Sequence, residues 1–332
     1  MSSSGAIRHA DESHAGLFGA QALPDLEVIL AAPRGFCAGV QRAIDAVEEA
    51  LARFGPPVYV RRPIVHNLTV VRALEAKGAV FVQELDEVPD DGVVIFSAHG
   101  VAPAIAAEAR RRALVSYDAV CPLVAKVHRE VVRHHRDGRH VLLIGHEGHP
   151  EVEGTLGQVP PGAVSVVQTM EHVRDMALPR ARPVAYAVQT TYSVEDAAAI
   201  IAIIEQSFDD VRGPPTNDIC YATTNRQAAL RAIAGSSDAI IVVGASFSSN
   251  ANRLAEIARE EGCPSVQLIE DCAGIDWAML DGAETLGITS AASTPESCVT
   301  EILERLGGRF KLDLREHRDT VETTVFKQLR LD

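Results

Sequence analysis

The sequence repeats one arrangement of residues three times. Cys37, Cys121 and Cys220 each stand between a strand-like or turn segment and the start of a helical pattern, in GFCAGVQRA, DAVCPLVAKV and NDICYATTNRQ. These cysteines are 84 and 99 residues apart. A pattern that recurs at such intervals indicates three related structural units, each built in the same way.

Two polar segments follow each of these cysteines at similar distances. The first segment follows the next strand-like run and lies 29, 28 and 28 residues after Cys37, Cys121 and Cys220, respectively. The second segment lies 62, 69 and 73 residues after the same cysteines. The residues at these positions are His66, His149 and Ser248 in the first set and His99, Thr190 and Ser293 in the second. Because α/β folds bind their ligands at the carboxyl ends of parallel strands, we expect each unit to contribute one cysteine and two polar segments to a common site.

Apolar, strand-like runs alternate with helical patterns along the chain. Examples of the runs are LEVILAA, VVIFSAHG, HVLLIGH and DAIIVVGAS, and helical stretches such as GVQRAIDAVEEALARF lie between them. This alternation is typical of parallel sheets covered by helices. The sequence therefore predicts an α/β protein of three similar domains with mainly parallel sheets, arranged as a pseudo-threefold trefoil. The predicted parts are a poorly ordered extension at 1–26, domains at 27–121, 122–217 and 218–309, and a C-terminal tail at 310–332.

The composition narrows the classes of partner. The 332 residues carry a net charge of −14, which disfavours a nucleic acid or an anionic membrane surface as the main partner. No run approaches the roughly 20 apolar residues of a membrane span, and the N-terminus lacks the basic and apolar parts of a secretory signal. We therefore expect a cytoplasmic protein that is a monomer or a homodimer.

Three cysteines that meet at a centre suggest a metal centre. A helix N-terminus lowers the pKa of a thiol and favours the thiolate, which is the form that binds metals. Three thiolates suit a zinc ion with one open position, or a [4Fe–4S] cluster with one iron that has no cysteine. Isolated cysteines favour the cluster over zinc, although these residues alone indicate three ordinary buried thiols about equally well. The other three cysteines lack the pattern and are interpreted as structural; they are Cys263, Cys272 and Cys298.

The polar segments are rich in groups that donate hydrogen bonds. VHN, SAHG, GHEGHPEVEGT, QTT, SFSSN and SAAS offer imidazole, hydroxyl, amide and backbone N–H groups, which together indicate a pocket for phosphate or diphosphate. Two carboxylates lie next to this pocket in HPEVEG. Either Glu151 or Glu153 could deliver protons there, and their spacing alone does not distinguish them.

These segments together resemble those of one enzyme family. PRGFCAGV, IVHN, FSAHGV, DAVCPLVAKVH, IGHEGHPEVEGT, QTT, DICYATTNRQ and SSNANRL are similar to the motifs of 4-hydroxy-3-methylbut-2-enyl diphosphate reductases, which catalyse the last step of the methylerythritol phosphate (non-mevalonate) route to isoprenoids. The resemblance runs from about Leu26 to about Arg309. The motifs are long, ordered and rare.

The resemblance implies a cofactor and a set of site residues. It implies a central [4Fe–4S] cluster bound by Cys37, Cys121 and Cys220, with one open iron. It also implies that Glu151, helped by Thr190, is the proton source. The diphosphate ligands that it implies are His66, His99, His149, Ser248, Ser249, Asn250 and Ser293, and Thr190 also belongs to the substrate site.

The resemblance further implies a reaction. Reductive dehydroxylation of (E)-4-hydroxy-3-methylbut-2-enyl diphosphate gives isopentenyl and dimethylallyl diphosphate, as two electrons arrive singly through the cluster, protons are added and water leaves. A reduced ferredoxin or flavodoxin is the expected electron donor, since the chain shows no nucleotide-binding fingerprint. The sequence departs from the family in SAASTP, where Ala291 replaces a common glycine, and in the tail after Arg309, which looks shortened.

Two other classes of function use the same residues. A hydrolase or transferase would use Cys37 or Cys121 as nucleophile with His66 or His149 as base, which leaves two matched cysteines unexplained. An iron–sulfur or zinc sensor would use the three thiolates alone, which leaves Glu151 and the polar segments without a role.

Overall fold

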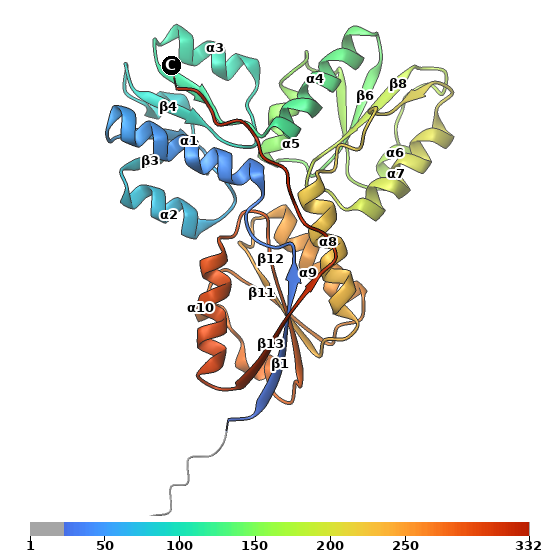
Figure 1. Cartoon of the computed structure of the whole chain (residues 1–332). Coiled ribbons are helices and arrows are strands. Elements are labelled where there is room, and N and C mark those ends of the chain that lie inside the picture. The colour runs from blue at the N-terminus through green and yellow to red at the C-terminus, as the bar shows by residue number, and fades with distance from the viewer. Residues whose placement is uncertain (1–22, 332) are drawn as a thin grey trace, which may run out of the picture.

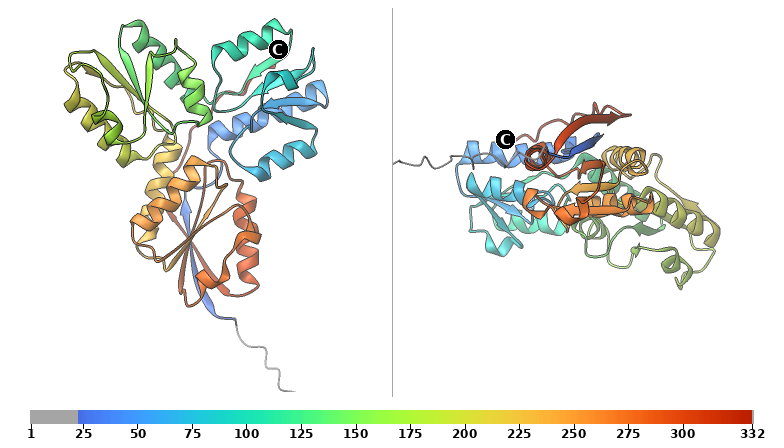
Figure 2. Two further views of the ribbon diagram at one scale, coloured as in Figure 1. Left: turned by 180° about the vertical axis from the view of Figure 1, so that it is seen from behind. Right: turned by 90° about the horizontal axis from the view of Figure 1, so that it is seen from below.

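The computed structural model describes residues 23–331, and within them it has three parallel β-sheets, each flanked by helices. The three sheets form three lobes that meet at the centre of the molecule (Figure 1). The same lobes are seen from behind, and the C-terminus again lies beside the first of them (Figure 2). The predicted α/β class with three parallel-sheet units is confirmed. Most of the predicted extension, residues 1–22, lies outside the described part of the chain.

Sheet B has the strand order β3-β2-β4-β5, with every pair parallel. We call the segment from α1 to β5 unit B. Its elements are α1 (Ala38–Phe54), β2 (Val58–Arg61), α2 (Leu68–Ala76), β3 (Ala79–Val82), the 3₁₀ turn η1 (Leu85–Glu87), β4 (Val93–Phe96), α3 (Pro103–Arg111) and β5 (Val115–Asp118).

Sheet C repeats this topology with the order β7-β6-β8-β9, again parallel throughout. We call the segment from α4 to β9 unit C. Its elements are α4 (Pro122–Arg136), β6 (His140–Ile144), α5 (Pro150–Leu156), β7 (Val164–Val167), α6 (Met170–Arg174), β8 (Val184–Val188), α7 (Val194–Ser207) and β9 (Val211–Arg212).

Sheet A, the largest sheet, has the order β11-β10-β12-β1-β13. Its strand β1 (Asp25–Ala32) comes from the start of the chain and occupies the place that β5 and β9 hold in the other sheets. We call this third group unit A. Its other elements are α8 (Tyr221–Ala234), β10 (Ala239–Val243), α9 (Ser249–Glu260), β11 (Ser265–Ile269), η2 (Cys272–Gly274), η3 (Trp277–Leu280), β12 (Thr285–Ser290), α10 (Glu296–Gly307) and β13 (Lys311–Arg318).

The sheet pairing corrects two expectations about the ends of the chain. Residues 27–32 were expected to begin the first domain, but β1 pairs with β12 and β13 in sheet A. Residues 310–332 were expected to be a tail, but β13 is an eight-residue strand of the same sheet. The hydrophobic pattern of a strand does not encode its partner, so neither pairing follows from the local sequence. The remaining domain boundaries stay predictions.

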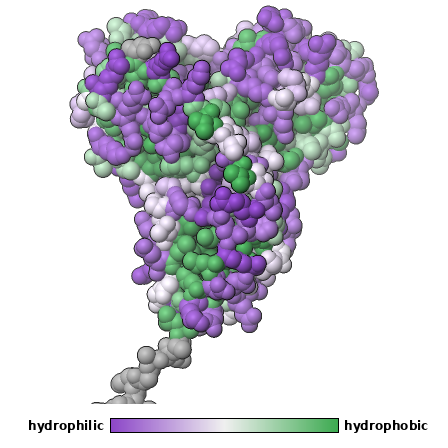
Figure 3. All heavy atoms as spheres, viewed as in Figure 1, coloured by the Kyte–Doolittle hydropathy of each residue, from purple (hydrophilic) through white to green (hydrophobic). Residues whose placement is uncertain are grey.

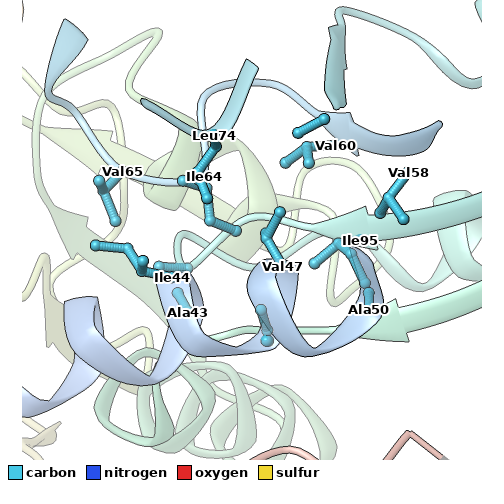
Figure 4. Packing of buried hydrophobic residues seen from close by; sticks show 14 of the residues in the cluster. Ala43, Ile44, Val47, Ala50, Val58, Val60, Ile64, Val65, Leu74 and Ile95 are labelled. Atoms are coloured by element: carbon cyan, nitrogen blue, oxygen red, sulfur yellow. The ribbon is translucent and has the colours of Figure 1, made fainter. Parts of the chain in front are cut away.

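The core of unit B shows how these lobes are stabilised. Helix α1 places Ala43, Val47 and Ala50 against Val58 of β2 and Ile95 of β4, as Figure 4 shows. All five side chains are fully buried. Burial of apolar surface contributes about 25 cal/mol per Å², which makes such clusters the main stabilising contribution of each lobe.

The segment after β13 crosses the junction of the lobes. It runs from sheet A over the centre and ends on unit B (Figure 1). Leu331 is 2% exposed and packs with Leu329 into the core of unit B, whereas Val325 is 88% exposed. The segment is therefore anchored at its far end.

The surface is mainly hydrophilic over the outer parts of the two upper lobes, and a band of apolar residues runs down the lobe of sheet A (Figure 3). Within residues 23–331, no helix combines the length and the apolar character needed to cross a membrane.

Candidate functional site

The three repeated cysteines occupy equivalent places in the fold. Each is the N-cap residue of a helix, α1, α4 or α8, at the point where the chain leaves one sheet for the next. The strand before each cysteine pairs with a neighbouring strand of the same sheet, and the backbone N–H of the cysteine donates to a carbonyl two residues after the end of that neighbour. Cys37 donates to Ala292 at 3.2 Å, Cys121 to Ala98 at 3.0 Å and Cys220 to Thr190 at 3.0 Å.

These carbonyls belong to the second set of polar segments, so each cysteine lies beside one of them. His99 follows Ala98, and Ser293 follows Ala292. The internal repeat therefore corresponds to a real threefold arrangement of cysteines and strand ends.

The predicted site residues lie around a central cavity of about 100 Å³. All of them line it: Cys37, Cys121, Cys220, His66, His99, His149, Glu151, Thr190, Ser248, Ser249, Asn250 and Ser293. Phe326 of the C-terminal segment also lines the cavity. A wider hollow of about 570 Å³ shares His66, His149 and Ser249 with the cavity and therefore adjoins it.

Burial raises the pKa of two of the three thiols, contrary to the expectation that the helix N-termini lower it. Burial, with a smaller contribution from neighbouring thiols, raises the pKa of Cys121 to about 12 and that of Cys220 to about 11. An activated nucleophile has a lowered pKa, so the raised value argues against Cys121 as the nucleophile of a Cys–His mechanism. Binding of a metal group would displace these protons, because only thiolates are ligands.

The space around the thiols also fits a group larger than one ion. A Cβ at Gly39 would lie 2.6 Å from the Sγ atom of Cys121 and 3.8 Å from that of Cys37, so both sulfurs face this glycine. Among residues 23–331, no three His, Cys, Asp or Glu side chains are placed to hold a single metal ion. Three thiols around one cavity, but not around one point, suit a cluster of several metal atoms.

Three imidazoles from units B and C stand together on another side of the cavity. The ring centroids of His66 and His99 are 4.2 Å apart, and those of His66 and His149 are 5.1 Å apart. Burial lowers the pKa of His66 to about 4 and that of His149 to about 3, and it lowers the pKa of His99 well below its usual value. A bound anion would raise all three pKa values, because it would pair with the protonated rings.

Three helices begin within two residues of a side chain that lines the same cavity, namely His66, His149 or Ser248. Asn67, His149 and Ser248 are the N-cap residues of α2, α5 and α9, so the N-termini of these helices lie at equivalent strand ends. Helix N-termini carry partial positive charge and free N–H groups, which favour an anionic ligand.

Unit A adds hydrogen-bond donors that have no partner. Ser249 Oγ and Asn250 Nδ2 are buried and make no hydrogen bond. Asn250 Oδ1 accepts from the N–H of Ala292, which leaves the amide nitrogen facing the cavity lining. Since an unsatisfied buried donor is costly, these two groups indicate a ligand with acceptor oxygens.

The departure at Ala291 does not displace the neighbouring serine. Ala291 is fully buried, and its N–H donates to Val243 O at 2.9 Å. Ser293 still lines the cavity, and its hydroxyl donates to His66 O at 2.9 Å.

The environment distinguishes the two carboxylates that the sequence left open. Glu151 is 3% exposed, and its oxygens accept from the Thr190 N–H at 2.7 Å and the Thr190 hydroxyl at 2.8 Å. Burial raises the pKa of Glu151 to about 7, against the lowering effect of these two bonds. Glu153 pairs with Arg62 instead, with a side chain that is 46% exposed. Glu151 is therefore the carboxyl that can exchange a proton with the cavity near neutral pH.

Some lining residues were not predicted. Phe247 lies 5.5 Å from the His66 ring in the adjoining hollow, and Phe326 reaches the cavity from the far end of the chain. Phe247 lies within SFSSN, where only the polar residues were considered, and Phe326 lies outside the repeated pattern. His146, which is absent from the predicted ligands, lies in the hollow with its ring 4.9 Å from that of Tyr192.

Comparison with known proteins gives consistent matches over almost the whole chain. The family described as "LytB protein" matches residues 28–307. The chain is 54% identical to the 4-hydroxy-3-methylbut-2-enyl diphosphate reductase of Gluconobacter oxydans, over 93% of each chain. It is 51% identical to the enzyme of that name from Paracoccus denitrificans, over 93% of this chain and 98% of the relative.

Solved structures agree with these matches. The E-1-hydroxy-2-methyl-but-2-enyl-4-diphosphate reductase of Plasmodium falciparum superposes with a TM-score of 0.85 at 37% identity, covering 91% of this chain and 95% of that one. A second structure, described as (E)-4-hydroxy-3-methyl-but-2-enyl diphosphate reductase, the terminal enzyme of the non-mevalonate pathway, has a TM-score of 0.61 at 31% identity, covering 85% and 99%. The threefold cysteine arrangement therefore lies in a chain that belongs to the LytB protein family.

Proposed function

We propose that the chain is a reductase that converts (E)-4-hydroxy-3-methylbut-2-enyl diphosphate into isopentenyl and dimethylallyl diphosphate, the last step of the non-mevalonate route to isoprenoids. The observation that carries this proposal is the single cavity in which three cysteines, three imidazoles and a buried carboxyl from different units meet. The names of the relatives supply the substrate class.

A [4Fe–4S] cluster held by Cys37, Cys121 and Cys220 is the cofactor in this proposal. When bound, it would supply the two electrons of the reduction one at a time. Gly39 supports this assignment, since the absence of a side chain leaves room beside two of the sulfurs. The electrons would come from a reduced ferredoxin or flavodoxin in the cytoplasm.

The diphosphate would bind among the donors of all three units. His66, His99 and His149 would gain protons as the anion enters, which converts three neutral rings into charged donors. The unpartnered Ser249 and Asn250 groups would satisfy further phosphate oxygens, and Ser248 and Ser293 border the same space. These groups orient the substrate and exclude water from the cavity.

Glu151 would donate one of the two protons that the reaction consumes as two electrons are added and water leaves. With a pKa of about 7, its carboxyl is both protonated and able to ionise near neutral pH, which suits a general acid. Thr190 keeps the carboxyl in place through its N–H and its hydroxyl, and these two bonds stabilise the carboxylate that remains after the transfer.

Anaerobic purification tests the proposal. We expect a brown protein with about four irons and four sulfides per chain, because a cubane contains four of each. It should convert the diphosphate substrate when supplied with a chemical reductant. A colourless, zinc-containing protein would contradict the proposal, and a coloured protein without turnover would favour the sensor.

A pair of cysteine variants sharpens this test. Cys121→Ser should lose the cluster, because it removes one of three ligands. Cys272→Ser is the matched control and should keep both iron and turnover, since Cys272 packs beside the core of unit A. Loss of iron in the control would overturn the choice of ligands.

A further inference from the structure

Three cationic side chains repeat with the cysteines. Arg42 and Lys126 lie five residues after Cys37 and Cys121, and Arg226 lies six residues after Cys220. Each therefore sits on the first turns of the helix that its cysteine caps. All three reach across to a loop that holds another of the three cysteines.

Arg42 of α1 connects the two ends of unit B. Its guanidinium donates to Val120 O at 3.0 Å, and Val120 directly precedes Cys121. A second N–H of Arg42 donates to Lys327 O at 2.9 Å, in the C-terminal segment.

Lys126 of α4 connects the two ends of unit C. Its ammonium donates to Thr216 O at 2.8 Å, to Asn217 O at 3.0 Å and to Asp218 Oδ1 at 3.0 Å. The Asp218 side chain is fully buried and also accepts from Val188 N, at the end of β8. This loop leads directly into Cys220.

Arg226 of α8 connects the two ends of unit A. Its side chain is fully buried and donates to Gly35 O at 2.7 and 3.2 Å, two residues before Cys37. The guanidinium also donates to Ala222 O at 2.9 Å and to Glu322 Oε1 at 2.8 Å, in the C-terminal segment.

In the topology of the fold, the three cations make equivalent contacts. A unit begins with a capped helix and ends with the loop that carries the next cysteine, so each cation links the start of a unit to its end. Each link therefore closes the base of one unit between the two cysteines that flank it. Arg42 spans the pair Cys37 and Cys121, Lys126 the pair Cys121 and Cys220, and Arg226 the pair Cys220 and Cys37.

We propose that Arg42, Lys126 and Arg226 are positioning residues that fix the three separations between the cysteines, so that the chain presents a preformed triangle of thiols to the cluster. The inference rests on the proposed function for the identity of the cofactor. The three cations donate mainly to backbone carbonyls, so they act on loop positions. Removal of one takes a donor from the half-buried Val120 carbonyl, the buried Asp218 carboxylate or the buried Gly35 carbonyl, and it frees one side of the triangle.

The metal-free chain tests this geometry directly, by cross-linking of cysteine pairs with a short bifunctional thiol reagent and mass spectrometry. Arg42→Gln should lower the yield of the Cys37–Cys121 link several-fold and leave the other two links unchanged. Lys126→Gln should act in the same way on Cys121–Cys220, and Arg226→Gln on Cys220–Cys37. Equal loss of all three links in each variant, or no loss in any, would overturn the proposal.

Two control variants remove one positive charge from the same helices but leave the contacts with the cysteine loops intact. Arg231→Gln lies on α8 and removes ion pairs with Glu195 and Glu261, and Arg133→Gln lies on α4 beside Glu130. Both should cross-link like the unchanged chain. If Arg226→Gln fails to fold, Arg42→Gln and Lys126→Gln, whose side chains are less buried, still decide the question.

Iron retention gives a second measurement in the loaded protein. The three variants should lose iron to a chelator about tenfold faster than the unchanged chain, and Lys126→Arg should restore much of the difference because it keeps a donor. Retention equal to that of the unchanged chain in all three would contradict the proposal. If the unchanged chain itself holds no iron while the pairwise cross-links change as expected, the proposed cofactor fails and the positioning role stands.

Discussion

At the scale of single residues, burial decides which groups can act in the site. The sequence placed Glu151 and Glu153 next to the same histidines and offered no means of choosing from the residues alone. The choice depends on how the turn after β6 enters the cavity, because this turn brings Glu151 to Thr190, just after β8, and turns Glu153 toward Arg62. A pKa of about 7 follows from that burial and has no counterpart in the local sequence.

Glu151→Gln should keep the cluster and lose most of the turnover. The amide fills the same space but has no acidic proton to give, and general acid catalysis typically contributes about 10²- to 10⁴-fold. Iron content and turnover of the same preparation measure the two effects. Glu153→Gln is the control and should turn over nearly as well as the unchanged chain.

The pH dependence of turnover has a defined direction. The protonated carboxyl is the donor, so turnover should fall as the pH rises through about 7. Normal turnover in Glu151→Gln would show that another group supplies the proton.

At the scale of elements, the sequence predicted where strands form better than where they pair. LEVILAA, VVIFSAHG, HVLLIGH and DAIIVVGAS were recognised from their apolar runs, and each of them contains a strand. The alternation of apolar and charged residues in KLDLREHR is also a strand pattern, yet its place after the resemblance ends suggested a tail. Partners of parallel strands are far apart in sequence, so the register of β1 between β12 and β13 could not be predicted from it.

The C-terminal segment is anchored at its far end by Leu331 and makes further contacts along its length through Glu322, Phe326 and Lys327. Leu331→Ala should release the far end from unit B, because it removes a nearly fully buried side chain from an apolar core. The expected result is faster cleavage of residues 319–331 in limited proteolysis, together with a higher KM as Phe326 leaves the cavity. Val325→Ala, at an 88% exposed position, should change neither. Equal cleavage of both variants would show that Leu331 does not anchor the segment.

At the scale of the whole molecule, the site exists only where three units meet. The repeated offsets predicted this convergence, because equivalent strands of similar units end at equivalent places. The sequence also repeats a cationic residue five, five and six residues after the three cysteines, at Arg42, Lys126 and Arg226. This repeat was not recognised from the sequence. It could not be interpreted without the topology, since each cation acts on a loop 78 to 191 residues away.

Diphosphate binding should therefore be coupled to proton uptake. In the free protein the three imidazoles are neutral near pH 6.5, since burial lowers their pKa values, and a bound anion raises those values. Affinity for inorganic diphosphate should increase as the pH falls from 8 to about 6. Calorimetry in buffers of different ionisation enthalpy measures the protons taken up.

His149→Gln provides the reference for this measurement. Protonation of the diphosphate itself is the same in experiments with the variant and with the unchanged chain. The difference in proton uptake between the two proteins therefore measures the contribution of the His149 imidazole. The variant should take up fewer protons and show a shallower pH dependence. Identical uptake in the two proteins would contradict the proposed role of His149.

The position of β1 in sheet A has a consequence for biosynthesis. The strands of sheets B and C all lie between Val58 and Arg212, so a ribosome finishes both sheets while β1 still has no partner. Sheet A becomes complete only when β12 and β13 have emerged, and the loop that carries Cys37 gains its fixed position at the same moment. The nascent chain thus cannot hold all three thiols in place before β12 and β13 have been made, long after the segments that carry Cys121 and Cys220.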